Sequence, residues 1–341
     1  MDGQFARAKS LNVYTIPALT LVVGVGVYFL LFQIVVAPFH PSTDMLARSA
    51  PAFVVGAGAP VTEVAAKRMT ALYALAIPTI LMALSALALA VVAFSIVLKP
   101  YGRGAQLLGV AAIPVGGLIG FVEQYANPIR HLVADCRPGS APICPLDQAV
   151  AMGGSPPLLR AEDLDHIQWL VSLNSVVSVA ALCLIGACVL VLSRSVDPAT
   201  VSIAEMKARR AGLEGLLLVL APVLVFSVST THGFHHLAAA MMAEPDATAY
   251  NSLASTGTQY WGAVYTIIII VVAFPAVLSV TRDAKLVAAD RLPDADFAAR
   301  QEWRKKMGIE FAFRERVGVL LAAIAPVLTS PALDALRGFA G

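Results

Sequence analysis

Histidines are the side chains in this sequence best suited to chemistry, because imidazole exchanges protons near neutral pH and binds transition metals. Three of them, His232, His235 and His236, have the i, i+3 and i, i+4 spacing that places side chains on one face of a helix. Met241 and Met242 follow shortly after in the chain. Because imidazole and thioether ligands together suit copper, this segment is a candidate copper site.

A fourth histidine, His166, could complete such a site from another part of the chain. Asp163 precedes it by about one helical turn and could orient its second ring nitrogen, as carboxylates do beside metal-bound histidines. Imidazole with carboxylate suits zinc, and two histidines can also hold a haem iron. The spacings match neither a zinc finger nor H-E-x-x-H. The alternative for all of them, His40 and His131 included, is an amphipathic residue at a membrane interface.

The elements that position these residues must lie in a membrane. Of the 341 residues, 58% are hydrophobic and only 13% are charged, and the mean hydropathy is +0.77. A soluble domain carries about 25% charged residues, so this chain cannot solvate the surface of a soluble globule. The four cysteines are too few for a disulfide scaffold. The composition therefore predicts an all-α, polytopic transmembrane helix bundle.

Seven segments are long and apolar enough, or nearly so, to cross a bilayer, which takes about 20 helical residues. The first six contain no charged side chain, whereas the seventh contains Asp334 and either spans or dips into the interface. The first is too long for the apolar core of a signal peptide and is expected to remain as an anchor. The segments are 13–37, 72–98, 105–122, 168–192, 215–231, 259–280 and 317–336.

Lysine and arginine positions predict the orientation of these spans. If the amino terminus is inside, 17 of the 24 Lys and Arg residues fall on the inner side, which is the usual bias of inner-membrane proteins. We therefore expect a bacterial-type inner (plasma) membrane protein with a cytoplasmic amino terminus and an outer carboxyl terminus. The predicted parts are a six-helix bundle (1–280) with outer loops at 38–71, 123–167 and 232–258, a cytoplasmic segment (281–316), and the seventh segment with the carboxyl terminus (317–341).

Two cysteines in the second outer loop form a predicted disulfide. Cys136 and Cys144 are separated by seven residues that include two prolines and a glycine. Such a spacer closes readily, and disulfides persist in an oxidising compartment. Two unpaired thiols are the alternative.

Polar groups inside the predicted spans are all neutral through the first six segments. This argues against a proton pump or an ion-coupled transporter, which place charged side chains within the membrane. The fourth span carries a polar stripe that either bonds to neighbouring helices or lines a narrow polar path. The stripe consists of Ser172, Asn174, Ser175 and Ser178.

Prolines and glycines indicate how the helices bend and meet. Gly116 and Gly120 lie one turn apart, a spacing that lets helix backbones approach closely in lipid. The short connection at 99–104 predicts that the helices on either side pack as an antiparallel hairpin. Every span except the fourth contains a proline, which predicts kinks at several positions. The prolines are Pro17, Pro78, Pro114, Pro222, Pro275 and Pro326.

The inner segment contains a predicted amphipathic helix. Trp303, Met307 and Phe311 recur every four residues, and basic residues occupy the other faces. This pattern is typical of a helix lying on an anionic leaflet, although a free cytosolic helix fits it as well. The residues expected to contact the inner leaflet are Trp303, Arg304, Lys305 and Lys306.

Three functions are compatible with this sequence. The leading prediction is a non-catalytic conduit, sensor or assembly subunit for a neutral or weakly polar solute, with membrane partner subunits or a second copy of itself. The second is a copper, zinc or haem protein built on the outer histidines. The third is an enzyme acting at the lipid headgroups through Asp163 and His166 or the His232 cluster. Nucleotide-binding and hydrolase motifs are missing from the sequence, and the basic segments lack a nucleic-acid-binding fold.

Overall fold

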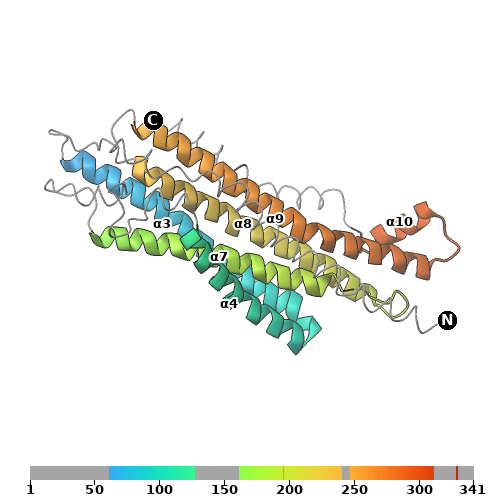
Figure 1. The fold of residues 1–341 in the computed structure, drawn as a ribbon. Helices are drawn as coiled ribbons and strands as arrows, with labels where there is room; N and C mark the ends of the chain where they lie inside the picture. The colour runs from blue at the N-terminus through green and yellow to red at the C-terminus, as the bar shows by residue number, and fades with distance from the viewer. Residues whose placement is uncertain (1–60, 127–160, 195, 240–245, 311–327, 329–341) are drawn as a thin grey trace.

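The computed structural model describes residues 61–126, 161–194, 196–239, 246–310 and 328. These residues are almost entirely helical and include no strand. After Val92, the chain forms a π-helical turn at Ala93–Leu98 and a 3₁₀ turn at Lys99–Tyr101. The α-helices are α3 (Val61–Val92), α4 (Arg103–Ala126), α7 (Ala161–Leu192), α8 (Ile203–Ala239), α9 (Asp246–Arg291) and α10 (Phe297–Lys306) (Figure 1).

In the part of the chain that the structure describes, five helical stretches are long and apolar enough to cross a membrane, so the chain has the character of a multi-pass membrane protein. The predicted spans at 13–37 and 317–336 fall outside the described residues, apart from Leu328, and the total of about seven stays a prediction. So do the proline kinks, although Pro78, Pro114, Pro222 and Pro275 do lie inside helices. The five stretches are Leu72–Tyr101, Arg103–Val122, Asp165–Leu192, Ile203–Leu237 and Ser255–Arg291.

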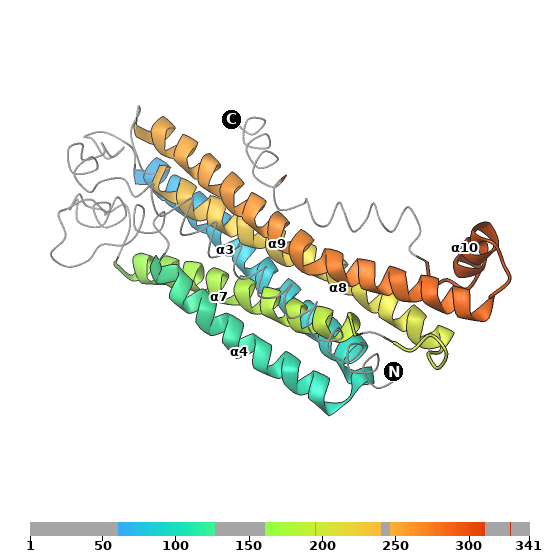
Figure 2. The ribbon, with the colours of Figure 1, turned by 45° about the vertical axis from the view of Figure 1, so that its right-hand side comes forward.

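Helix α8 lies at the centre of the described bundle. It packs against α3, α7 and α9, and α4 packs on the side of α7 (Figures 1 and 2). Successive helices run in opposite directions, so α8 begins where α7 and α9 end. We call this the basic end, because the lysines and arginines of 194–210 and 282–306 gather there. The opposite end, where α8 finishes with its histidines, is the histidine end.

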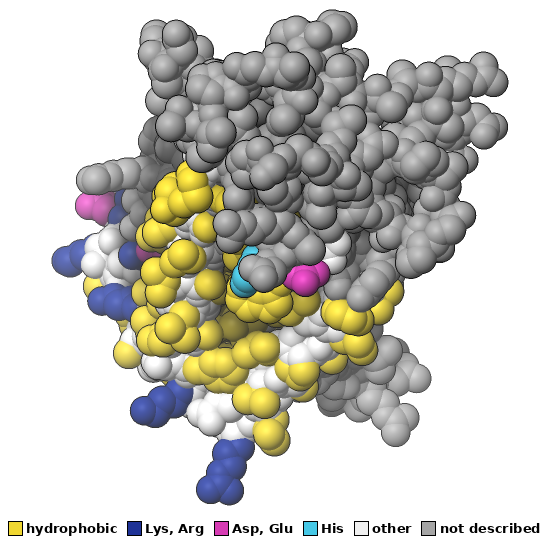
Figure 3. Space-filling view, turned by 90° about the vertical axis from the view of Figure 1, so that its left-hand side faces the viewer, with side chains coloured by type: hydrophobic (Ala, Val, Ile, Leu, Met, Phe, Trp, Pro, Cys, Tyr) yellow, Lys and Arg dark blue, Asp and Glu magenta, His cyan; other side chains and the backbone are white. Residues whose placement is uncertain are grey.

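Large apolar side chains cover the outside of α3 and α4. A surface of this kind marks contact with a membrane or with another protein. Figure 3, which looks onto the histidine end, shows hydrophobic side chains over much of the described surface. Examples that are more than half exposed are Ile77, Ile80, Leu84, Leu87, Leu107 and Leu118.

The predicted hairpin between α3 and α4 is wrong in its packing. Pro100 lacks a backbone N–H and cannot continue an α-helix, so the chain turns sharply and Gly102 ends the turn at φ 86°. After this turn α4 contacts α3 mainly through the π-helical end and lies along α7 instead. The close approach predicted for Gly116 and Gly120 is confirmed, but against α7: a Cβ on Gly116 would lie 2.7 Å from the Ala180 Cα.

The predicted amphipathic helix forms as α10, but its apolar side faces protein. Asp296 caps its first turn by accepting a hydrogen bond from the Ala299 N–H at 2.7 Å. Trp303 and Met307 are partly buried against an apolar cluster at the basic end, and Phe311 lies outside the described residues. The cluster consists of Val201, Met206, Ala284, Val287 and Ile309.

The basic residues of α10 therefore divide into two groups. Arg304 is only 4% exposed and pairs with Glu310 at 3.7 Å. Lys305 and Lys306 are exposed. Their contact with the inner leaflet stays a prediction.

The alternation of the helices makes a topological prediction. Ala199 and Asp294 are exposed at the basic end, and Asp165 is exposed where α7 begins at the histidine end. After replacement by cysteine one at a time, an impermeant maleimide added to intact cells should label Asp165→Cys but not Ala199→Cys or Asp294→Cys, because the lysine-rich side is predicted to face the cytoplasm. Labelling of Asp165→Cys and Asp294→Cys from the same side would contradict the arrangement of the spans.

Candidate functional site: a polar column in an apolar bundle

Helix α8 changes from apolar to polar at its histidine end. Ser227, Thr231 and His235 recur every four residues, which places them along one stripe of the helix. Side chains from the neighbouring helices extend this stripe. We call the resulting group the polar column, and it consists of Ser227, Thr231 and His235 of α8, Asn174 and Ser178 of α7, and Tyr265 of α9.

Hydrogen bonds connect the column across three helices. The Asn174 side-chain amide donates to Thr231 Oγ1 at 3.3 Å, which joins α7 to α8. One turn along, Ser227 Oγ and the Tyr265 hydroxyl lie 3.2 Å apart and join α8 to α9. Ser178 donates to the carbonyl of Asn174, within α7. The column is therefore partly satisfied by the protein itself, as buried polar groups in an apolar medium must be.

Two buried atoms of the column have no hydrogen-bond partner among the described residues. They are Asn174 Oδ1 and His235 Nδ1. Asn174 is 6% exposed and His235 is 5% exposed, so bulk water does not replace the missing partners. A buried polar atom left unpaired costs about 1–3 kcal/mol, so each such atom calls for an explanation.

The other two histidines of α8 face α9. The rings of His232 and His236 lie against each other, with centroids 4.1 Å apart and planes tilted by 55°. His236 Nδ1 lies 2.5 Å from the side-chain oxygen of Asn251, and His232 Nδ1 lies 3.5 Å from the Thr258 hydroxyl. Both contacts fix the orientation of the imidazole rings against the start of α9.

Close contact with α3 fixes the remaining side of α8. Thr79 Oγ1 donates to Thr230 Oγ1 at 3.3 Å. A Cβ on Gly233 would lie 2.6 Å from the carbonyl oxygen of Ala74, so only glycine allows α3 to approach here. The histidine segment is thus held from three sides, by α3, α7 and α9.

The polar column ends at a continuous apolar core. Beyond Ser227, towards the basic end, the buried positions of α8 are leucine and valine, and they pack on apolar residues of α7 and α9. No charged side chain belongs to this core cluster of the described chain. Its members from α8 are Leu213, Leu216, Leu217, Leu220, Val223 and Leu224, and they meet Leu184, Ile185, Cys188, Ile268 and Ile269 among others.

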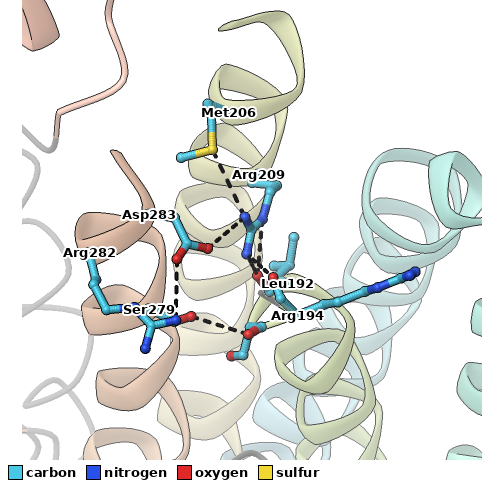
Figure 4. Close-up of polar contacts among 8 residues, drawn as sticks. Leu192, Arg194, Met206, Arg209, Ser279, Arg282 and Asp283 are labelled. Atoms are coloured by element: carbon cyan, nitrogen blue, oxygen red, sulfur yellow. Dashed lines mark hydrogen bonds and ion pairs between the residues drawn. The ribbon is translucent and has the colours of Figure 1, made fainter. Parts of the chain in front are cut away.

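A buried ion pair lies past this core, at the basic end (Figure 4). Arg209 and Asp283, each 1% exposed, form a salt bridge of 3.0 Å between α8 and α9. The same guanidinium donates to the backbone carbonyls of Leu192 and Arg194, where α7 ends. Since the carbonyls at a helix end have no partners within the helix, Arg209 supplies them from outside. We call this group the Arg209 clamp.

The structure divides the predicted serine stripe of α7. Asn174 and Ser178 are buried towards α8, whereas the backbone carbonyl of Ser175 faces Gly120 of α4. Ser172 and Ser175 are only partly buried. Residues that recur every three positions on a helix with 3.6 residues per turn do not stay on one face, so this division of the stripe is expected.

The predicted metal ligands are only partly within the described chain. His232, His235 and His236 are buried together on α8, whereas His166 is exposed at the start of α7. Within the described ranges, no three His, Cys, Asp or Glu side chains are grouped as a metal ion would require. Cys183 and Cys188 are free thiols. The side chain of Asp163 and residues His40, His131, Met241, Met242, Cys136 and Cys144 lie outside what the structure describes.

Several residues of the column escaped the sequence analysis. The four-residue spacing of Ser227, Thr231 and His235 was the available signal, but it lay at the boundary between a predicted span and a predicted loop. Arg209 and Asp283 were counted only as loop charges. The chain matches no protein-family model, no curated protein and no solved structure.

Proposed function

We propose that this protein is a non-catalytic membrane sensor that binds a neutral, weakly polar solute in the polar column. The observation that carries the proposal is a hydrogen-bonding column that is closed at one end. It begins at His235, runs through Thr231 and Asn174, and stops at Ser227 and Tyr265 against the apolar core. The solute enters from the histidine end, which the distribution of lysine and arginine assigns to the outside of the membrane.

The chemistry of the column favours a neutral solute. Its hydrogen-bonding groups are hydroxyls, one amide and one imidazole, and none of them carries a fixed charge. An ion would have to shed its hydration shell without a compensating charge, which is costly in an apolar surrounding. A neutral molecule with a hydrogen-bonding group gives up much less hydration free energy when it enters the column.

The closed end of the column favours sensing over conduction. A conduit needs a polar path to both sides of the membrane, whereas here the buried layer around Leu220 and Leu224 separates the column from the basic end. Helix α8 nevertheless runs unbroken from the column to the Arg209 clamp. A displacement of α8 on solute binding would therefore also move its cytoplasmic end, where a sensor contacts its signalling partners.

Cysteine accessibility tests this proposal. Single cysteines replace His235, Thr231 or Leu220 in a chain whose own four cysteines are changed to alanine. A small neutral thiol reagent, 2-hydroxyethyl methanethiosulfonate, is added to right-side-out vesicles and the rate of labelling is measured by mass spectrometry. We expect His235→Cys to react fastest, Thr231→Cys more slowly, and Leu220→Cys at least tenfold more slowly than His235→Cys, because only the column admits polar solutes.

The matched control is Leu218→Cys, which lies on the same helix but is 63% exposed on the outside of the bundle. It reports how much reagent arrives through the bilayer rather than through the column. Equal rates at His235→Cys and Leu220→Cys, both slow, would remove the proposal that a solute reaches the column. Equal and fast rates would indicate a path past the apolar core and therefore a conduit in place of a sensor.

A further inference from the structure

We propose that Asn174 and His235 together bind a single hydroxyl group, so that the ligand of the column is a neutral alcohol-like molecule or a water molecule. The inference deepens the proposed function and, for the alcohol, rests on it. It starts from the two buried atoms that lack partners in the described chain, Asn174 Oδ1 and His235 Nδ1.

The positions of the two residues bring these atoms to one part of the bundle. Asn174 is held against Thr231 by its own amide, which donates to the threonine hydroxyl. His235 follows Thr231 on the same stripe of α8 after four residues, a rise of about 6 Å along the helix axis. One oxygen atom can bridge two atoms that lie up to about 6 Å apart, since each hydrogen bond to it measures about 2.8–3.0 Å. In the proposed site, Asn174 Oδ1 and His235 Nδ1 lie within this reach of each other.

The hydrogen-bonding capacity of the two atoms points to a hydroxyl. The side-chain oxygen of Asn174 can only accept, so the ligand must donate to it. His235 Nδ1 donates in one neutral tautomer and accepts in the other. A hydroxyl group can donate its one proton to Asn174 and accept a hydrogen bond from His235 when Nδ1 carries the ring proton. Water, which has two protons, also fits the tautomer in which Nδ1 accepts. An ether or a ketone has no proton for Asn174.

The surroundings favour an apolar body attached to that hydroxyl. Phe234, Leu237 and Ile167 are all at most 3% exposed around this end of α8 and α7. From the column towards the basic end, the next buried side chains of α8 are those of the apolar core. A small monohydric alcohol meets both requirements, whereas a sugar would bring further hydroxyls that this apolar setting would leave unpaired.

Histidine NMR on the full-length protein in lipid nanodiscs tests the inference. The protein is labelled with ¹⁵N-histidine, and His235→Phe identifies the His235 signals by their loss. The probe is 1-butanol, and 1-chlorobutane serves as a probe of similar shape without a hydroxyl. We expect a saturable shift of the His235 Nδ1 signal with 1-butanol only. Asn174→Leu should weaken this response by about tenfold, the effect of losing one hydrogen bond.

The control variant is Thr79→Val, which removes a hydrogen bond to α8 on the side of α3 and should leave the titration unchanged. A His235 Nδ1 signal that is hydrogen-bonded without butanol, does not respond to butanol and changes in Asn174→Leu would support the hydroxyl site with water as its occupant. A signal typical of a nitrogen without a hydrogen bond, or one indifferent to Asn174→Leu, would overturn the inference. If cysteine labelling at position 235 succeeds while this test fails, the sensor proposal survives without the hydroxyl site.

Discussion

Replacing Asp283 with alanine is expected to lower the free energy of unfolding by about 3–5 kcal/mol, because it leaves the buried guanidinium of Arg209 without its counter-charge. At 1% exposure, the guanidinium of Arg209 cannot reach water without moving α8. Arg209→Ala should be at least as harmful, since it also removes the donors to the carbonyls of Leu192 and Arg194. Unfolding in mixed detergent and SDS micelles, followed by circular dichroism, measures both effects.

Arg282 provides the control for this prediction. Its guanidinium also contacts Asp283, at 3.3 Å, but its side chain is 56% exposed. Because the Arg282 end of this pair is open to water, the pair contributes less than about 1 kcal/mol, so Arg282→Ala should be close to wild type. Equal losses for Asp283→Ala and Arg282→Ala would show that burial of the Arg209 clamp does not decide its strength.

A double variant separates charge from helix capping. In Arg209→Met with Asp283→Leu both charges are gone, and apolar replacements of buried ion pairs are often neutral or stabilising. The carbonyls of Leu192 and Arg194 still lose their donor, which leaves a deficit of about 1–3 kcal/mol. A double variant as unstable as Asp283→Ala would mean that capping of α7, and not the charge pair, dominates the clamp.

The clamp also shows what the sequence could not predict. Arg209 and Asp283 lie outside the charge-free segments, and each was interpreted as an inner loop residue. The helices continue well beyond the apolar stretches, however: α8 begins at Ile203 and α9 ends at Arg291. Neighbouring helices therefore bury charges that hydropathy assigns to loops. Hydropathy locates the lipid-facing part of a helix but carries no information about its ends.

The spans were predictable because lipid imposes a simple rule on helix length and polarity. The partners of each helix were not. Between helices in lipid the hydrophobic effect gives little preference, and association depends on close fit and on a few hydrogen bonds. Gly116 and Gly120 revealed a face for close approach, but nothing in the pattern distinguished α7 from α3 as its partner. The histidine cluster was likewise predictable as a helical segment, whereas the bond from Asn174 to Thr231 required the packing of α7 on α8.

The second large effect is expected at two glycines of α4, Gly116 and Gly120, that lie against the backbone of α7. Gly116→Ala should destabilise the protein by about 1–3 kcal/mol, the usual cost of overpacking. The added Cβ would lie 2.7 Å from Ala180 Cα and 2.8 Å from the carbonyl oxygen of Val179, and backbone atoms cannot rotate away. Gly120→Ala, with its Cβ 2.5 Å from the Ser175 carbonyl oxygen, should act in the same way. Detergent unfolding of the purified variants gives the comparison.

Gly117→Ala is the matched control, because it makes the same chemical change one residue further along the helix. Its Cβ would meet only a methyl group of Val176, at 3.6 Å, which is an ordinary contact. The gain in helix propensity from glycine to alanine, up to about 1 kcal/mol, should then make this variant neutral or slightly more stable than wild type. If Gly116→Ala and Gly117→Ala behave alike, then α4 is not fitted to the backbone of α7. The pairing of α4 with α7 would then have to be replaced by the hairpin with α3 that the short connection suggests.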